Sequence, residues 1–223
     1  MEQLWNAMRS RHSVRRYTDR PIKGEVLEKL QAKIAHCSAE SGLSIQYIEN
    51  EPAVFAGLAS YGFFTGVRSY LAFVGVPSPL LEETVGRYGE ELVLYAQTLG
   101  LSTCWVGGTY SRKKCSVQVA EGEKLVCLIV IGYGENPGRP HKNRPLAKLC
   151  TAPEPMPDWF AKGMEAALLA PTAINQQKFH FTLKEGRVLA EETGGPYSKV
   201  DLGIVKYHFE LGAGKENFAW AEA

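Results

Sequence analysis

A run of nine almost uninterrupted apolar residues, from Leu125 to Tyr133, places the strongest constraint on the fold. Val and Ile are frequent in it, so we predict a buried β-strand over residues 124–133. The run is too short for a bilayer, which requires about 20 apolar residues in a helix. The N-terminal segment also lacks the apolar core of a signal peptide. We therefore expect a cytoplasmic protein that is neither secreted nor membrane-bound.

Other segments predict a mixture of helices and strands. Apolar residues recur at helical spacing between Glu25 and His36, which is typical of an amphipathic helix. Further helices are expected over residues 80–99 and 159–169 and from Ser198, and further strands over residues 43–49, 69–76, 102–106 and 178–183, with a tight turn at Glu185-Gly186. Helices and strands do not alternate strictly. This favours an α+β fold with one central sheet, mixed or antiparallel, flanked by helices.

Composition narrows the classes of protein that the chain can belong to. The 223 residues, 45% hydrophobic and 22% charged, suit one large or two small globular domains. The net charge of +1 argues against a dedicated nucleic-acid binder, so any cationic site must be local. The five cysteines are scattered and form no CxxC pair, which supports neither a zinc site nor a disulfide framework. Free thiols fit a reducing cytosol.

A weak internal repeat runs through the chain. The spacing from Gly89 to Trp105 is 16 residues, and that from Gly203 to Trp220 is 17 residues. The first expected helix and strand are likewise paralleled by the helix and strand within residues 159–183. Either similarity alone could arise by chance, so the residues leave open whether the chain contains a duplicated unit.

Two basic clusters are candidate anion-binding segments. Residues 11–16 contain three arginines, a histidine and Ser13. Arginine offers a forked, permanent charge that suits phosphate oxygens, and serine can donate a hydrogen bond. By itself, such a cluster is more commonly a solvated basic face. The second cluster, residues 142–146, follows a Gly/Pro-rich connection, and the sequence does not show whether the two clusters meet.

Two further segments could present backbone and amide groups to a flat ligand. Residues 99–108 end in Gly107-Gly108, where the backbone can approach a ligand closely, although a simple turn is also common. Residues 170–177, with the sequence APTAINQQ, follow a helix that Pro171 cannot continue. Their amides and hydroxyl could bond the edge of a heterocycle, or the segment could be a structural loop. Nucleophile-elbow, HExxH, Walker A and Rossmann glycine motifs are absent from the sequence.

Taken in order, these segments resemble the FMN-dependent nitroreductase family. Residues 11–15 (RHSVR) are similar to its N-terminal phosphate motif, and residues 99–108 to its strand and glycine turn. Residues 131–134 (IGYG) followed by KNRPL at residues 142–146 are similar to its closing motif, and residues 170–177 to its APSAxNxQ segment. The resemblance implies FMN as the redox cofactor, NAD(P)H as reductant, and a nitroaromatic, a quinone or a related small molecule as acceptor.

One departure from the family pattern concerns the APSAxNxQ-like segment. In ordinary members it follows the first helix, whereas here residues 36–41 occupy that place and the segment comes after KNRPL. Ordinary members are dimers that build each flavin site from both subunits. The resemblance therefore implies a single-chain pseudo-dimer, monomeric or weakly dimeric, that binds one flavin. Residues 1–150 would form its first half, and residues 151–223 a shortened second half.

The resemblance also implies roles for individual residues. The flavin phosphate would be held by Arg11, Ser13, Lys142 and Arg144. Arg15 would lie near the ring, Gly107 or Gly108 would donate a backbone N–H near the hydride-accepting atom, and Asn175 would bond the ring edge. The full cofactor-binding set implied is Arg11, His12, Ser13, Arg15, Val106, Gly107, Gly108, Lys142, Arg144, Pro171, Thr172, Ala173, Asn175 and Gln177. Because hydride transfer needs no side-chain acid or base, no catalytic side chain is assigned.

Two alternatives stay open at this point. A flavin-binding carrier, sensor or degenerate paralogue with little turnover would keep the same motifs, since the short second half could lack a cover over the substrate. A nucleic-acid or other anion-binding module would use only residues 11–16. The near-zero net charge and the lack of interleaved aromatic residues disfavour that module.

Overall fold

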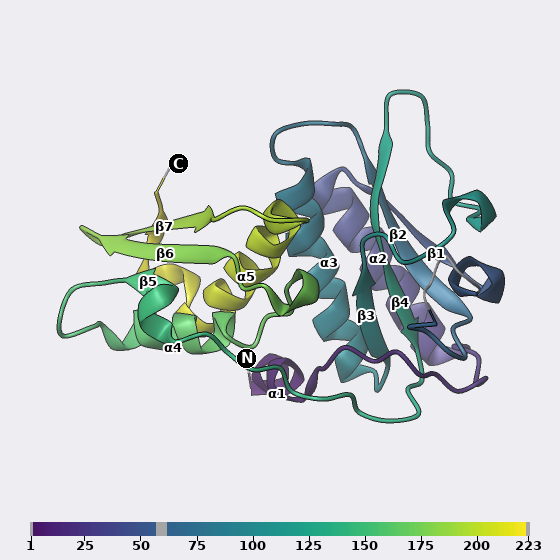
Figure 1. The fold of residues 1–223 in the computed structure, drawn as a ribbon, viewed down its shortest axis with the longest axis horizontal. Coiled ribbons are helices and arrows are strands. Elements are labelled where there is room, and N and C mark those ends of the chain that lie inside the picture. The colour runs from purple at the N-terminus through teal and green to yellow at the C-terminus, as the bar shows by residue number, and fades with distance from the viewer. Residues whose placement is uncertain (1, 57–61, 222–223) are drawn as a thin grey trace. The chain divides into compact units, whose positions relative to one another are not determined.

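The computed structural model describes residues 2–56 and 62–221. Its helices are α1 (Glu2–Ser10), α2 (Glu25–Ser41), α3 (Leu81–Thr98), α4 (Asp158–Ala167) and α5 (Ser198–Ala213) (Figure 1). Its strands are β1 (Ser44–Ile48), β2 (Ser69–Gly75), β3 (Ser102–Val106), β4 (Lys124–Gly132), β5 (Cys150–Thr151), β6 (Phe179–Lys184), β7 (Arg187–Glu192) and β8 (Ala219–Trp220). The predicted α+β class is confirmed. Within the described residues no helix is long and apolar enough to cross a membrane.

Helix α2 departs most from its expected bounds. It continues to Ser41, beyond the predicted end at His36. It ends where Gly42 adopts a φ of 71° and donates its N–H to Ser38 O at 2.9 Å. A glycine in this left-handed conformation is a common helix end because it carries no Cβ atom. The end of the helix is therefore set by this glycine and not by the apolar spacing.

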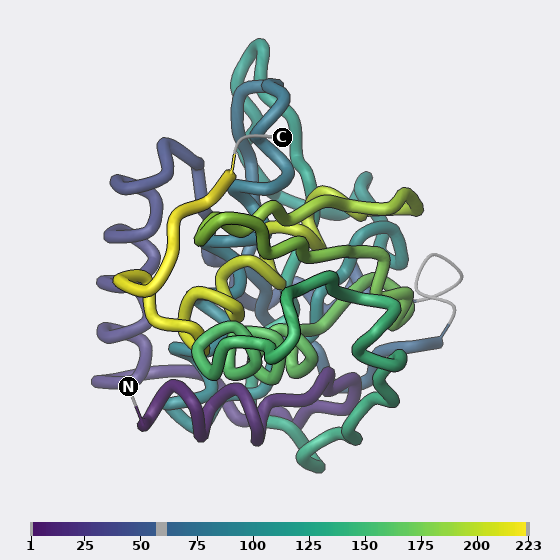
Figure 2. The backbone as a smooth tube through the Cα atoms, turned by 90° about the vertical axis from the view of Figure 1, so that its left-hand side faces the viewer, coloured from purple at the N-terminus to yellow at the C-terminus, as the bar shows by residue number. Residues whose placement is uncertain are grey.

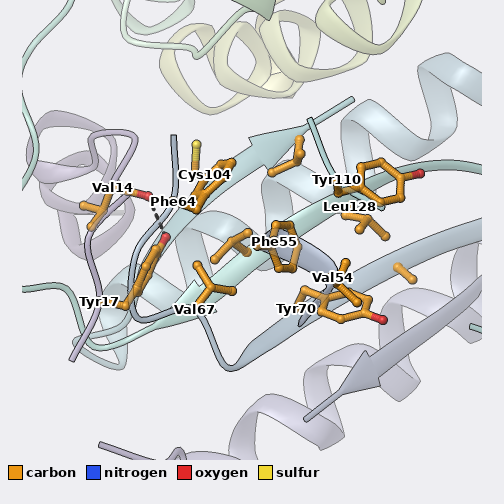
Figure 3. Close-up of a cluster of buried hydrophobic side chains, with 13 residues drawn as sticks. Val14, Tyr17, Val54, Phe55, Phe64, Val67, Tyr70, Cys104, Tyr110 and Leu128 are labelled. Atoms are coloured by element: carbon orange, nitrogen blue, oxygen red, sulfur yellow. Dashed lines mark hydrogen bonds between the residues drawn. The ribbon is translucent and has the colours of Figure 1, made fainter. Parts of the chain in front are cut away.

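The first sheet has the strand order β1-β2-β4-β3, and every neighbouring pair is antiparallel. All residues of β2 are buried, and Phe73 lies opposite Cys127 of the apolar run in β4. A hydrophobic cluster packs against this sheet (Figure 3). In it the Phe55 ring packs edge-on against Phe64 and Tyr70, with centroid distances of 5.6 and 5.5 Å. The apolar run thus forms a central strand of a buried core.

The second sheet has the order β5-β6-β7-β8. Strands β6 and β7 form an antiparallel hairpin whose turn is Glu185-Gly186, with φ values of 54° and 74°, so the predicted turn is confirmed. Strands β5 and β8 add in parallel at the two edges. This sheet has its own aromatic core, in which Phe181 stacks on Phe209 at 4.8 Å. The expectation of one central sheet is therefore wrong, because the chain beyond residue 150 builds a separate hairpin and core.

The chain divides into two compact units. Of the described residues, 10–56, 62–81 and 91–140 form the first-sheet unit, and 2–9, 82–90 and 141–221 form the second-sheet unit. Helix α3 therefore contributes its first half to one unit and its second half to the other. Because these units follow packing and not chain order, the division of the chain at residue 150 stays a prediction.

Helix α1, which we did not predict, belongs almost entirely to the second-sheet unit. It lies beside α4 in both views (Figures 1 and 2). Arg9 Nη2 is 3.2 Å from Glu165 Oε1, and Ala7 and Met8 are buried. Its sequence does place Leu4, Trp5, Ala7 and Met8 at helical spacing, but a helix of nine residues is too short to be stable without packing.

The order helix, strand, strand, helix, strand occurs twice along the chain, as α2-β1-β2-α3-β3 and as α4-β6-β7-α5-β8. The starts of α3 and α5, Leu81 and Ser198, are 117 residues apart, and so are the starts of β3 and β8, Ser102 and Ala219. Among the described residues the second set has no counterpart of β4. The fold therefore repeats in part, with a register different from the one that the glycine–tryptophan spacing suggested.

Helices α3 and α5 contact each other within the second-sheet unit at Gly86 and Gly203. These two glycines are also 117 residues apart. A Cβ atom at Gly86 would overlap the carbonyl oxygen of Val200, and one at Gly203 would overlap that of Glu83. Each overlapped residue lies three positions before the glycine of its own helix. The two contacts are therefore equivalent when the helices are exchanged, as in a two-fold interface. Gly86, and not Gly89, corresponds to Gly203.

Candidate functional site

The basic segment of residues 11–16 lies beside β3 in the first-sheet unit. Ser13 pairs with Thr103 in a parallel bridge, and the Val14 N–H donates to Thr103 O at 3.0 Å. The Tyr17 hydroxyl donates to Val14 O at 2.7 Å, a bond drawn in Figure 3. The segment is therefore held as an extended stretch, in which alternate side chains point to the same side.

Three side chains of this segment influence the thiol of Cys104 in β3. Burial raises the pKa of this thiol, while the charge of Arg15, a hydrogen bond with Ser13 and the charge of Arg11 act in the opposite direction. Arg11 is 3% exposed, whereas Arg15 lies at the surface. One face of the segment therefore carries two permanent positive charges and a hydroxyl, a donor set that suits a phosphate group.

The other predicted residues of this unit differ in their surroundings. Arg16 forms an exposed ion pair with Glu135, at 3.5 Å. His12 is half-buried and lines a pocket of 370 Å³. Val106 is buried in the hydrophobic cluster, so only its backbone could meet a ligand. Gly107-Gly108 forms the bend after β3 and is partly exposed, as a backbone contact would require.

In the second-sheet unit, the basic cluster after β4 is joined to the loop of residues 171–177. The side chains of Asn175 and Gln177 both donate to Lys142 O, at 2.9 and 2.8 Å. The backbone N–H of Arg144 donates to Gln177 Oε1 at 2.9 Å, and its guanidinium to Gln177 O at 3.4 Å. Gln177 is 3% exposed. Its buried amide therefore connects the two segments through their backbones.

The backbone of this loop is unusual. Ile174, Asn175 and Gln177 have φ values of 47°, 55° and 45°. For a β-branched residue such as isoleucine this conformation is rare, and it persists only where surrounding contacts hold it. The Ile174 side chain is nevertheless 89% exposed, so packing of that side chain does not hold the loop. The hydrogen bonds of the neighbouring residues must do so.

Asp201, which was not a predicted site residue, provides part of that support from the first turn of α5. The Ala173 N–H donates to its two carboxylate oxygens at 2.9 and 3.1 Å, and Gln176 Nε2 donates to Oδ2 at 2.7 Å. Burial raises the pKa of Asp201 to about 6, opposed by the hydrogen bonds from Gln176 and Ala173. An aspartate in the first turn of a helix is common, so the sequence carried no signal for this contact.

The structure thus brings the four predicted segments together as two pairs, one in each unit. Residues 11–16 lie along β3, and residues 142–144 are bonded to the loop of residues 171–177. The Arg144 guanidinium donates a hydrogen bond to Gln177 O, which belongs to the same unit. The sharing of one phosphate by Arg144 and Arg11 stays a prediction. Across residues 2–56 and 62–221, no cluster of three His, Cys, Asp or Glu could hold a metal ion.

Comparison with known protein families matches residues 3–213 to the family described as "Putative TM nitroreductase". The chain belongs to this nitroreductase family. The resemblance of the motifs is thereby confirmed, and membership supports an oxidoreductase enzyme. No curated protein matches the sequence.

Solved structures share the fold of this nitroreductase. A "putative nitroreductase" from Thermotoga maritima MSB8 is 22% identical with a TM-score of 0.67, over 96% of this chain and 84% of that chain. A "putative nitroreductase in complex with FMN" from Desulfovibrio desulfuricans is 20% identical with a TM-score of 0.53, over 69% of this chain and 98% of that chain. A protein titled "Putative NADH dehydrogenase/NAD(P)H nitroreductase" from Parabacteroides distasonis is 20% identical with a TM-score of 0.52, over 66% and 96%. The last two therefore correspond to about two thirds of this chain.

Proposed function

We propose that this nitroreductase is an FMN-dependent enzyme that passes hydride from NAD(P)H to a nitroaromatic, a quinone or a related small acceptor. The observation that carries the proposal is the placement of Arg11, Ser13 and Arg15 at alternate positions of the segment bridged to β3, where all three influence the thiol of Cys104. A phosphate group is bound most strongly by charge-assisted hydrogen bonds, and two guanidinium groups with a hydroxyl supply them. The residues present therefore fit the phosphate of FMN.

The first-sheet unit would bind two parts of the cofactor. Arg11 and Ser13 would hold the phosphate, and the more exposed Arg15 would lie at the electron-rich edge of the ring. When bound, FMN supplies the hydride-accepting atom. The charge of Arg15 would stabilise the negative charge that arises on hydride transfer, because a fixed positive charge needs no reorganisation. The Gly107 or Gly108 N–H would donate near the accepting atom.

The second-sheet unit would supply the remaining contacts. Lys142 and Arg144 would add charge for the phosphate. The loop of residues 171–177 would bond the ring edge through Asn175, whose side chain is already oriented by its bond to Lys142 O. Small side chains in this loop would let a flat ring approach; these are Pro171, Thr172 and Ala173. Preoriented amides lose less conformational freedom on binding than free ones.

We further propose that the chain is a pseudo-dimer, monomeric or weakly dimeric, whose halves are residues 1–150 and 151–223. The spacing of 117 residues shared by the α3/α5 and β3/β8 pairs and the reciprocal contact of Gly86 and Gly203 support a duplicated unit. The second set of elements has neither a counterpart of β4 among the described residues nor a second RHSVR-like segment. One flavin per chain follows from this asymmetry.

The test is the visible spectrum of the purified protein with FMN quantified per chain. We expect a yellow protein with close to one FMN per chain, and steady NAD(P)H consumption with a nitroaromatic or quinone. A stoichiometry near two would contradict the single site. A colourless protein that takes up no added FMN would contradict the cofactor, and bound FMN without turnover would favour a carrier or sensor.

Arg11→Ala should lower the affinity for FMN. The loss of one charge-assisted contact costs about 1.5–3 kcal/mol. This corresponds to roughly a ten- to hundredfold rise in Kd. Arg144→Ala should act in the same direction, whereas Arg16→Ala, which removes an exposed ion pair with Glu135, is the matched control. Wild-type flavin content of both variants after dialysis would overturn the phosphate assignment.

A further inference from the structure

The loop of residues 171–177 is fastened to α5 by one buried carboxylate. Asp201 is 2% exposed, and it accepts hydrogen bonds from the Ala173 backbone N–H and from Gln176 Nε2. The same Gln176 nitrogen also donates to Pro196 O at 2.8 Å, in the connection that leads into α5. All these groups belong to the second-sheet unit. Burying a charge is costly, so a carboxylate at this place needs a reason.

Helix formation alone does not explain Asp201. A negative charge in a first turn is favourable beside the positive end of a helix. In the repeated element, however, the spacing of 117 residues puts Thr84 of α3 at the equivalent position. The first copy of the helix carries its first-turn carboxylates at Glu82 and Glu83, and forms without one at the position of Asp201. What distinguishes the second copy is the loop of residues 171–177, which contacts Asp201.

Close packing of Gly195 against Gln176 also helps to hold the hydrogen bond between Gln176 and Asp201. Gly195 has a φ of 114°, and a Cβ atom at that position would overlap Gln176 Oε1. Glycine is the residue that tolerates both the backbone conformation and the close approach. Gln176 is thus seated against the backbone with its amide nitrogen directed at Asp201 and Pro196. The left-handed residues Ile174 and Asn175 lie between two fastened points, Ala173 and Gln176.

We propose that Asp201 is a positioning residue, which holds residues 173–176 in the one conformation that presents Asn175 to the flavin. The proposal rests on the FMN function proposed above. Without the carboxylate, the strained backbone at Ile174 and Asn175 would relax, because its local conformation is unfavourable by itself. Asn175 would then sample several positions, and binding would carry the cost of selecting one of them.

The test compares Asp201→Asn with Asp158→Asn. Asparagine has the shape of aspartate and can accept a hydrogen bond from the Ala173 N–H. Its amide nitrogen, however, is a donor that would face the Gln176 Nε2 donor, so the hydrogen bond to Gln176 is lost. Asp158 is an exposed aspartate in the first turn of α4, so its variant controls for loss of a first-turn charge. Three quantities are measured for each: the melting temperature, the Kd for FMN, and the hydrogen exchange of the Ala173 amide in flavin-free protein.

For Asp201→Asn we expect exchange of the Ala173 amide and the Kd for FMN both to rise roughly tenfold, the effect of losing one hydrogen bond to a charged group. The melting temperature should not fall, because a buried charge is removed. Asp158→Asn should change neither the exchange nor the Kd. A merely structural role would lower the melting temperature and leave the Kd of the folded protein unchanged.

The two proposals can fail separately. If the wild type binds FMN, and Asp201→Asn binds it equally well with the Ala173 amide equally protected, Asp201 is not a positioning residue. If the wild type binds no FMN, the proposed function is wrong. In that case, exchange of the Ala173 amide in the flavin-free protein still tests whether Asp201 holds residues 173–176. Faster exchange in Asp201→Asn supports this role, and unchanged exchange overturns it.

Discussion

At the scale of single residues, the sequence indicated which side chains could bind an anion but not what they contact. Arg11, Ser13 and Arg15 share a face because they alternate along an extended segment, and alternation can be read from sequence. The bond between Gln177 and Arg144 could not be read, because it joins backbone and side chain across distant segments. Asp201 was missed for the same reason. Local patterns carry no information about such tertiary hydrogen bonds.

The stability of the protein should depend on pH through Asp201. Burial raises its pKa from 3.8 to about 6 in the folded state, so the folded protein binds this proton more tightly than the unfolded chain does. Its contribution is therefore most favourable below pH 4 and is lost as the pH rises to 6. As the pH rises from 4 to 7, we expect the free energy of unfolding of Asp201→Asn to increase by up to about 3 kcal/mol relative to that of the wild type.

Urea unfolding of both proteins at pH 4.5 and pH 7.5 measures this difference. Asp158→Asn should show no comparable change, because its carboxyl group lies at the surface. Equal free energies of unfolding for wild type and Asp201→Asn at both pH values would show that the buried carboxyl group is not titrating as described.

At the scale of secondary-structure elements, prediction succeeded where a local signal exists. The apolar run gave β4, and the helical spacing over residues 80–99 gave α3, each within one residue of its bounds. Strands β5, β7 and β8 were missed. Half of the residues of β7 are charged, and it is a strand because it pairs with β6, whereas β5 and β8 are only two residues long. The single sheet was predicted wrongly because strand pairing is a tertiary property that no local pattern encodes.

Gly86→Ala should destabilise the protein. Replacing glycine by alanine inside a helix usually stabilises it by about 1 kcal/mol. Here the added methyl group would overlap Val200 O on the neighbouring helix, so α3 and α5 would have to separate. We expect the opposite sign, a loss of about 1–3 kcal/mol, as for other overpacked positions.

Gly203→Ala should behave in the same way, because its methyl group would overlap Glu83 O. Thermal unfolding of the two single variants measures both losses. The double variant should lose less than their sum, since helices that have separated for one methyl group accommodate the second. A rise in melting temperature for either single variant would contradict the close contact.

At the scale of the whole molecule, α3 links the folding of the two compact units. Its first half packs in the second-sheet unit and its second half in the first-sheet unit. A helix is cooperative along its length, so loss of one half removes support from the other. We therefore expect one unfolding transition for the whole chain.

Tryptophan fluorescence can test this expectation in each unit. A variant that keeps only Trp105 reports on the first-sheet unit, and one that keeps only Trp159 reports on the second-sheet unit. In each variant, the urea midpoint from tryptophan fluorescence should equal the midpoint from circular dichroism, which reports on the whole chain. Distinct midpoints within one variant would show that the units unfold independently.

The correspondence of Gly86 with Gly203, and of Thr84 with Asp201, also bears on how such a protein can change. In a homodimer every substitution appears in both copies at once and must suit both surroundings. In one chain, the two glycines can be kept where the helices touch while a neighbouring position differs between the copies. Under the proposed duplication each copy is inherited and selected separately, so a mutation in the loop of residues 171–177 changes no residue of the first copy.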